Sequence, residues 1–347
     1  MRGLTNYHLS CCVNTLLQTL SATWEVADVL ERWETGGVRG DSHSVPLQLK
    51  NVLAAMRSDS PQHVPHRDFL HCLDRNCVRL NTQHDADEVF LSILNFVQQQ
   101  MDDKTLVGLQ SLLFFILYLY TCVIYVCLPL FLCQALEIQD LYKISVETHL
   151  RCLDCSSVQT RSSYLLSLPL HIKEDHNSLE SCISSFLEEQ ELRDINRCFC
   201  AQCGTKTPSK QGVKLLSLPH ILCVHLKRFR SSRVYTRKLD CRVSFPETFD
   251  FSEIVRDAFS TDFAQNECKY TLYAVVVHSG YAMYGHYTAF IRHRTNQRWF
   301  YADDSHIQQA SWEEVQKTYG GRYSDTAYML MYRRGSKEGG QQPELSS

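Results

Sequence analysis

The stretch GHYTAFIRHRTNQRWFYADD, residues 285–304, has the pattern of two β-strands around a short polar turn. With 295–297 as the reversal point, an antiparallel hairpin centred near 294–295 places His286 opposite Asp303. Directly opposed side chains in such a pair lie about 5 Å apart at Cβ. An imidazole that faces a carboxylate is the base and its orienting acid in a nucleophilic triad. The pattern therefore predicts an enzyme whose nucleophile lies elsewhere in the chain.

Length, charge and cysteine content narrow the class of protein. The 347 residues can bury a substantial core and could form one large domain or two. A net charge of -3 argues against a nucleic-acid binder, which would normally carry a basic face. The chain has 16 cysteines, and the residues after Met1 do not form a signal peptide. We therefore expect a reducing compartment, the cytosol or the nucleus, where cysteines are metal ligands, nucleophiles or core residues.

One segment differs from the rest of the chain. Residues 112–133, LLFFILYLYTCVIYVCLPLFLC, carry no charge and are long enough to cross a bilayer. They could form a membrane helix, although Pro129 disturbs it, or a buried core segment, although helices that are apolar on every side are unusual outside large cores. We favour a third interpretation, a retained intron that covers part of 107–134. The segment's codons are pyrimidine-rich, 131–134 can encode a tract that ends in CAG, and Val107 has a codon that begins with GT.

Elsewhere the periodicity predicts helices first and strands later. Apolar residues recur at helical spacing over 13–20 and 86–97. Strand-like runs follow at 221–229, 270–278, 286–293, 298–302 and 327–334. This order predicts an α+β protein with a cleft between its halves. The polar, glycine-containing residues 335–347 are predicted to be disordered.

Cys11 is the candidate nucleophile. It comes just before the first apolar helical stripe, with Ser10 as a plausible N-cap. A cysteine at a helix N-terminus gains thiolate character from the unpaired N–H groups and the helix dipole. The alternative is that Cys11 and Cys12 are small core residues. Asn6 could stabilise an oxyanion with its side-chain amide, or it could be an ordinary turn residue.

A second group of cysteines has the spacing of a metal site. Cys152 and Cys155 form one CxxC pair, and Cys200 and Cys203 form another. Two such pairs typically make a closed, structural Cys₄ zinc site. Cys198 is a rival ligand, and four unrelated reduced thiols are the alternative. If the site is real, the loop-rich stretch depends on metal for its folding.

Together these motifs resemble those of the ubiquitin-specific proteases. The resemblance runs in order from residue 3 to about residue 333 and is interrupted only by the apolar segment. The matching segments are GLTNYHLSCCVNTLLQ at 3–18, QHDADE at 83–88, LP and LKRF within 218–229, HSG and GHY within 278–287, and WFYADD at 299–304.

The resemblance implies a papain-like fold with a thumb at about 1–106, fingers at about 140–215 and a palm at about 216–334, which together make a catalytic domain over 1–334. It implies that Cys11 is the nucleophile, His286 the general base and Asp303 its orienter. Asn6 would contribute to the oxyanion hole, with Asp304 as a helper. The structural zinc would be held in the fingers by Cys152, Cys155, Cys200 and Cys203, and no organic cofactor is implied.

The implied reaction is hydrolysis of the isopeptide bond after the C-terminal Gly-Gly of a ubiquitin-like modifier. Further segments resemble an interferon-induced branch of the family, which removes the interferon-stimulated two-domain modifier and restrains type I interferon signalling at the receptor. These segments are Cys11-Cys12 and the stretches 198–206, 236–238, 245–252 and 311–320. The expected partners are the modifier, its conjugates and the interferon receptor complex, with no nucleic acid and no membrane.

The chain departs from the family pattern directly before the nucleophile. Where the family usually has Gly-Asn-Thr or Gly-Gln-Thr, this chain has His8-Leu9-Ser10, and loss of that glycine could strain the loop. The chain also starts two residues before the first motif, so we expect a missing N-terminal exon. A ubiquitin-directed enzyme and a catalytically impaired binding scaffold are therefore the alternatives to an active deconjugating protease.

Overall fold

The described residues of the first half of the chain fold mainly into helices, most of whose described apolar residues are buried. The computed structural model describes residues 1–7, 9–33, 42–58, 63–79, 84–119, 137–175, 177–231, 235–254, 268–321 and 324–335, with backbone alone over 104–119. The helices are α1 (Cys11–Ala22), α2 (Trp24–Arg32), α3 (Val45–Arg57), α4 (His66–Arg75) and α5 (Ala86–Leu119).

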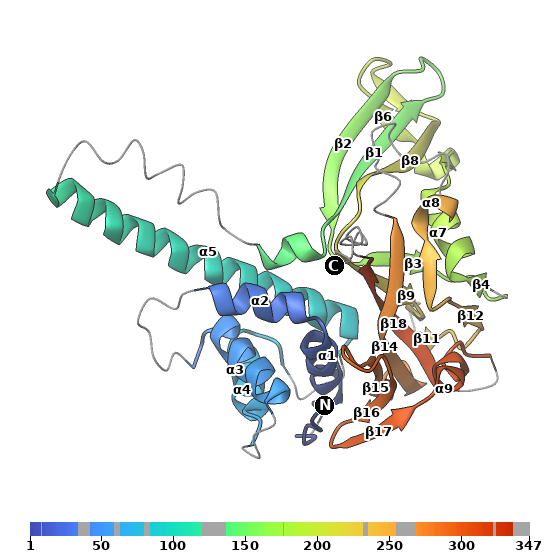
Figure 1. Cartoon of the computed structure of the whole chain (residues 1–347). Coiled ribbons are helices and arrows are strands. Elements are labelled where there is room, and N and C mark those ends of the chain that lie inside the picture. Colours follow the sequence, from blue (N-terminus) through green and yellow to red (C-terminus); the bar gives the residue numbers. More distant parts are fainter. Residues whose placement is uncertain are drawn as a thin grey trace, which may run out of the picture.

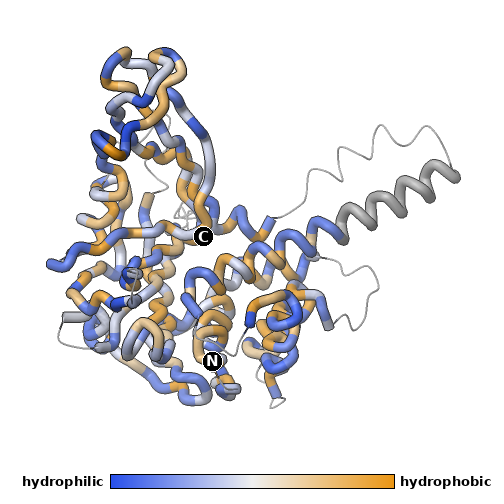
Figure 2. The backbone as a smooth tube through the Cα atoms, turned by 180° about the vertical axis from the view of Figure 1, so that it is seen from behind, coloured by the Kyte–Doolittle hydropathy of each residue, from blue (hydrophilic) through white to orange (hydrophobic). Residues whose placement is uncertain are grey.

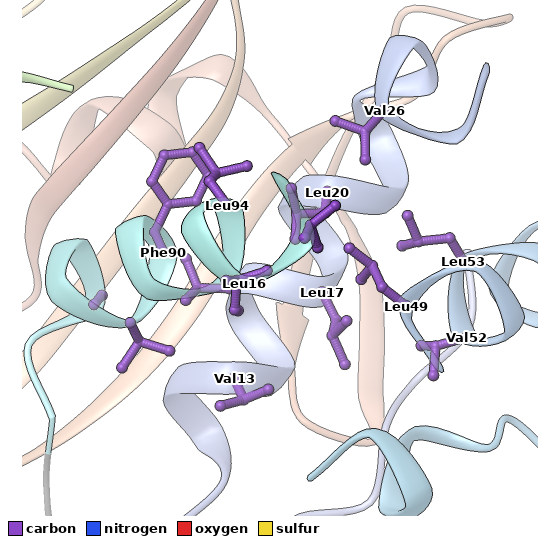
Figure 3. Close-up of a cluster of buried hydrophobic side chains, with 14 of the residues drawn as sticks. Val13, Leu16, Leu17, Leu20, Val26, Leu49, Val52, Leu53, Phe90 and Leu94 are labelled. Atoms are coloured by element: carbon purple, nitrogen blue, oxygen red, sulfur yellow. The ribbon is translucent and has the colours of Figure 1, made fainter. Parts of the chain in front are cut away.

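Helix α1 lies at the centre of this helical half. Its Leu16, Leu17 and Leu20 are fully buried, and they pack against apolar residues of α3 and α5 (Figure 3). Burying a leucine side chain stabilises a fold by about 1.5–3 kcal/mol. This packing fixes the direction of α1, whose N-terminus carries the candidate nucleophile.

The second half is built around an eight-stranded sheet (Figure 1). Seven strands lie side by side in the order β17-β16-β15-β14-β18-β9-β3, and β13 pairs with the first residues of β14. Among the described strand pairs of this sheet, β3–β9 is parallel and the others are antiparallel. The strands are β3 (Leu168–His171), β9 (Ile221–Lys227), β13 (Thr248–Asp250), β14 (Lys269–Tyr281), β15 (Tyr284–Arg292), β16 (Trp299–Asp303), β17 (His306–Ala310) and β18 (Thr326–Arg334).

The central strands are buried on both faces, which explains their continuous apolar runs. In β9, six consecutive residues are buried. Ile221 and Cys223 belong to the core that the sheet shares with the five helices, whereas Leu222 and Val224 belong to a second core on the opposite face. The sheet is therefore the middle layer between two cores.

The second core is closed by short elements around the sheet. Among them, α7 and α9 begin with capping boxes, at Ser178 with Ser181 and at Ser311 with Glu314. The elements are β4 (Asn177–Ser178), α7 (Leu179–Leu187), β11 (Thr236–Lys238), β12 (Val243–Ser244), α8 (Phe251–Ile254) and α9 (Trp312–Lys317). Two other short elements, η1 (Ile138–Leu141) and β10 (Phe229–Ser231), instead pack Ile138 and Phe229 on the core that the sheet shares with the helices.

A separate, narrower sheet projects from the body as the fingers (Figures 1 and 2). Its strand order is β2-β1-β8-β5, and a small β6–β7 hairpin lies at its end. Strand β2 is exposed along most of its length, so this sheet has little core of its own. The elements are β1 (Ile144–Cys152), β2 (Val158–Leu165), β5 (Gln190–Leu192), η2 (Asp194–Asn196), β6 (Cys198–Cys200), β7 (Thr205–Thr207) and β8 (Ser209–Ser217).

The architecture confirms the predicted α+β class, with helices early and antiparallel strands late. Of the apolar segment, the backbone to Leu119 continues α5, and residues 120–134 lie outside the described residues, as do 336–347 of the predicted tail. Where the structure describes the chain, we find no helix with the length and apolar character needed to span a membrane.

Candidate active site

The β15–β16 hairpin brings His286 to Asp303, although not in the predicted register. Nε2 of His286 lies 2.7 Å from Oδ1 of Asp303. The predicted pairing would place Ala289 opposite residue 300, whereas it lies opposite Ala302. The predicted register is therefore wrong by two residues. Side chains alternate between the two faces of a sheet with a period of two. A register shift of two residues therefore leaves His286 and Asp303 on the same face and preserves their contact.

The candidate nucleophile begins α1, as its position in the sequence predicts. Cys11 is the first residue of the helix and is 7% exposed. Ser10 occupies the N-cap position, but its side chain accepts no hydrogen bond from the helix. Instead, Ser10 Oγ accepts from the Tyr7 N–H at 2.9 Å and donates to Asn6 Oδ1 at 3.2 Å. The hydroxyl therefore orders the loop before the helix rather than capping it.

The pKa of His286 depends on one partner from each half of the molecule. Hydrogen bonding to Cys11, followed by that to Asp303, raises the pKa of His286 to about 9 against the opposing effect of burial. Because Nε2 contacts Asp303, Nδ1 is the ring nitrogen that can exchange a proton with the Cys11 thiol. A raised imidazole pKa favours transfer of that proton from sulfur to nitrogen.

Asp304 holds the loop that precedes Cys11. Its carboxylate accepts from Asn6 Nδ2 and from Asn14 Nδ2, each at 2.8 Å, and its backbone carbonyl accepts from the Leu4 N–H. Asp304 has a φ of 48°, a left-handed conformation that Asp tolerates better than most residues. The motifs of the sequence assign no role to Asn14. Its spacing of three from Cys11, which places both on one face of α1, is the signal that could have identified it.

Two glycines allow close approach around this site. A Cβ on Gly3 would lie 2.2 Å from the Ser305 carbonyl oxygen, and one on Gly285 would lie 2.1 Å from His278 Nε2. His278 is buried next to the site, and burial, followed by the charge of Lys238, lowers its pKa to about 3. It is therefore neutral under physiological conditions and does not compete electrostatically with His286.

A buried polar network joins the start of α5 to the large sheet. Tyr328 on β18 donates to the Asp85 carboxylate and lies 3.1 Å from His225 Nε2. Nδ1 of His225 lies 3.0 Å from Asp87 Oδ2. His225 lies on β9, so the network connects α5 to two strands. It holds the helical half against the sheet close to Cys12 and Tyr287.

The four cysteines of the two CxxC pairs meet at the end of the fingers. The sulfur atoms of Cys152, Cys155, Cys200 and Cys203 all lie within 4.8 Å of one another, a donor set that could hold a metal ion. The rival ligand Cys198 lies outside this group, with its sulfur 3.8 Å from the Asn196 carbonyl oxygen.

The two pairs have the same backbone geometry. The N–H of Ser156 donates to the Cys152 carbonyl, and the N–H of Gly204 donates to the Cys200 carbonyl. Both donors have positive φ, 61° and 69°. Each CxxC is therefore closed by a turn that directs its two sulfur atoms to the same point.

The first residue of the His8-Leu9-Ser10 departure from the family pattern cannot be placed, because His8 lies outside the described residues.

The chain matches the sequence profile of a family described as ubiquitin carboxyl-terminal hydrolase over residues 2–332. Ubl carboxyl-terminal hydrolase 18 of Homo sapiens is 32% identical over 343 residues, which cover 96% of this chain and 84% of that protein. The Mus musculus protein of the same name is 32% identical over 342 residues, with 96% and 85% covered. Ubiquitin carboxyl-terminal hydrolase 47 of Xenopus laevis is 25% identical over 401 residues, 95% of this chain but 28% of that protein.

Proposed function

Since the chain belongs to the ubiquitin carboxyl-terminal hydrolase family and is a cysteine-type hydrolase of ubiquitin-like modifiers, we propose that Cys11, His286 and Asp303 carry its reaction. The observation that carries the proposal is the contact of His286 with both partners. Asp303 binds its Nε2 at 2.7 Å, and hydrogen bonding to Cys11 is the largest cause that raises its pKa.

In the proposed reaction, the Cys11 thiolate attacks the carbonyl carbon after the Gly-Gly of the modifier. The imidazolium of His286 then gives its proton to the leaving lysine amine, and a thioester forms between the modifier and Cys11. Water attacks this thioester after His286 takes its proton, which releases the modifier and the free thiol. Asp303 fixes the ring orientation throughout.

The negative oxygen that develops in both steps needs a donor. Asn6 supplies its side-chain amide, and one N–H of that amide is bonded to Asp304 at 2.8 Å. Within the described part of the chain the second N–H has no other acceptor, and we propose that it donates to the oxyanion. Preorganised donors of this kind stabilise the transition state without reorganising during the reaction. Asp304 therefore acts on Asn6 and not on the substrate.

An electrophile placed at the C-terminus of a modifier tests this proposal. We expect a covalent adduct with the chain that Cys11→Ala abolishes. Cys12→Ala is the matched control, because burial, together with the neighbouring Cys11, raises the pKa of the Cys12 thiol well above its usual value. An adduct that persists in Cys11→Ala would refute the assignment. No adduct with folded protein would favour the binding scaffold.

The modifier is proposed to be the interferon-induced two-domain one. The two relatives described above that are named for a ubiquitin-like modifier are each 32% identical to the chain, and the one named for ubiquitin is 25% identical. Parallel probes on the two modifiers separate the alternatives, since the true substrate reacts faster. We extend the proposal to restraint of type I interferon signalling through the receptor complex, in the cytosol and the nucleus.

The metal is proposed to be zinc. A Zn–S bond of about 2.3 Å in a tetrahedral site puts sulfur atoms about 3.8 Å apart. The Cys155 and Cys200 sulfurs are 3.6 Å apart, and those of Cys152 and Cys203 are 4.0 Å apart. Bound zinc would cross-link the turn between β1 and β2 to the separate β6–β7 hairpin. Zinc content of the purified chain, measured by atomic absorption, tests the proposal, and a metal-free folded protein would refute it.

The domain is proposed to close without the apolar segment 107–134. Gln139 donates to Asn95 Oδ1 at 2.9 Å, and its backbone N–H contacts Gln98 Oε1 at 3.5 Å. Gln98, nine residues before the segment, therefore already lies against Gln139, five residues after it. A chain that lacks 107–134 should keep its unfolding temperature and probe reactivity, and transcript sequencing tests whether the segment is a retained intron. Loss of folding in the shortened chain would show that the segment is part of the domain.

A further inference from the structure

Two adjoining cavities lie away from the candidate active site, at the other end of β15. They have volumes of about 710 Å³ and 450 Å³ and share Trp24, Arg292 and Arg294 in their walls. Arg292 is six residues along β15 from His286, about 20 Å at the rise of a strand. The cavities also lie at the C-terminal end of α1, whose N-terminus carries Cys11. They therefore form a site separate from the one described above.

The walls of these cavities are strongly basic. Among the described residues, two carboxylates and six arginines line the walls, a local charge of +4, or +3 when Glu247, which pairs with Arg292 at 3.3 Å, is counted, in a chain whose net charge is -3. The arginines are Arg2, Arg57, Arg292, Arg294, Arg333 and Arg334, and the carboxylates are Glu25 and Asp28. This excess is the opposite of the charge of the whole chain.

Hydrogen bonds to neutral groups do not cancel this charge. Arg57 donates to the Ser21 and Thr23 carbonyls at the end of α1, which gives it a structural role but leaves its positive charge in place. Burial lowers the pKa of Arg57, the charges of Asp28 and Glu31 oppose that effect, and the smaller effect of the Arg294 charge adds to it. Arg57 therefore already has acidic neighbours, and an incoming anion would bind mainly to the other arginines.

Arg294 is the most available of these cations. It is exposed, it lies over the Trp24 ring at 4.2 Å from the centroid, and it donates no hydrogen bond to any described residue. Arg333 is 3.2 Å from the centroid of the same ring and is paired with Glu25 at 2.8 Å. The Trp24 ring thus contacts two guanidinium groups: that of Arg333, which is paired with Glu25, and that of Arg294, which is not.

We propose that the two cavities bind an acidic, extended segment of a partner protein. Guanidinium groups pair with carboxylates through two parallel hydrogen bonds, which suits Asp and Glu side chains. Nucleic acid fits less well because its binding surfaces offer free aromatic faces for base stacking, whereas Trp24 has arginines within cation–π distance. The carboxylates of Glu25 and Asp28 would also repel a phosphate backbone.

The test is fluorescence anisotropy with the whole chain and a labelled peptide of about twelve Asp and Glu residues. A Gln and Asn peptide of the same length and an oligothymidylate serve as comparison ligands. Arg294→Glu should weaken acidic-peptide binding by about tenfold or more. Arg298→Glu is the matched control, because it makes the same charge change on an exposed residue of the same loop that lines neither cavity.

The proposal is supported if the chain binds the acidic peptide tightly and if Arg298→Glu changes that affinity by less than twofold. The affinity should also fall as salt is raised from 50 to 300 mM. Equal weakening by both substitutions would show a non-specific charge effect and overturn it. Equal affinity for the uncharged peptide would also overturn it, as would tighter binding of the oligothymidylate. Probe reactivity at Cys11 should not change in Arg294→Glu, so failure of this proposal is distinguishable from failure of the proposed function.

Discussion

Asp304→Asn tests how the oxyanion donor is held in place. The carboxylate of Asp304 accepts hydrogen bonds from the amides of Asn6 and Asn14, each at 2.8 Å. Asn is nearly isosteric with Asp and tolerates the φ of 48°, so the backbone and the Leu4 hydrogen bond should persist. The substitution keeps one acceptor oxygen and turns an NH₂ group towards the other amide. At least one of the two charge-assisted hydrogen bonds is therefore lost.

The expected effect follows from the strength of that bond. A hydrogen bond to a charged group contributes about 1.5–3 kcal/mol, and about 1.4 kcal/mol corresponds to a tenfold change in rate. The upper limit is complete loss of an oxyanion donor, about 10²–10³ in kcat. We expect Asp304→Asn to lower kcat by about 10–100-fold, with KM changed by less than about threefold, since the donor acts on the transition state.

The assay is steady-state hydrolysis of a fluorogenic amide at the modifier C-terminus, combined with a double-mutant cycle. If Asp304 acts through Asn6, Asn6→Ala combined with Asp304→Asn should be no slower than Asn6→Ala alone. A double mutant whose loss equals the product of the two single losses would show that Asp304 acts independently of Asn6. An unchanged kcat in Asp304→Asn would show that the Asp304 carboxylate does not hold the oxyanion donor in place. Unfolding temperatures of the three variants serve as the control for folding.

Three further predictions concern the base, the fingers and the hairpin. Asp303→Ala removes one of the groups that raise the pKa of His286 to about 9, so the alkaline limb of the kcat/KM profile should move to lower pH; an unmoved limb would contradict the pairing. Cys155→Ser should lower both zinc content and the unfolding temperature, whereas Cys198→Ser, outside the sulfur cluster, should change neither; equal effects would mean that the wrong cysteines are assigned. Gly285→Ala should lower kcat about tenfold or more at an unchanged fold. The new Cβ would lie 2.1 Å from Nε2 of His278, so the strand must shift and carry the adjacent His286 with it. Normal turnover would show that position 285 does not need glycine.

The contact between His286 and Asp303 could be predicted from sequence, but its register could not. Alternation of apolar and polar residues determines which face a side chain occupies, and that face depends only on whether a position is odd or even. The register also depends on how many residues the turn uses. Here Gln297 takes a φ of 57° and the turn is wider than the pattern suggests, which shifts the pairing by two. The correct contact thus followed from the face and not from the register.

The partners of the site are less predictable because they are distant in sequence. Asn14 and Asp304 are 290 positions apart, and Asp85 and Tyr328 are 243 apart. Periodicity and spacing act over one helix or one hairpin, so they carry no information on such pairs. The CxxC spacing is a local signal for each cysteine pair, but the 44-residue gap between the pairs left Cys198 as a rival that only the assembled fingers exclude.

The proposed nucleophile, Cys11, and the proposed base, His286, come from different halves of the chain, but those halves share one core. The cluster that buries Leu16 and Leu20 of α1 also contains Ala289 and Ile291 of β15, the strand that carries His286. The helical half cannot move on the sheet without exposing these residues to water, so apolar packing sets the separation of Cys11 from His286. A displacement of about 1 Å can cost about 10² in rate. Precise chemistry here therefore depends on residues that touch no substrate, which explains why a site of five polar side chains needs an extensive apolar framework behind it.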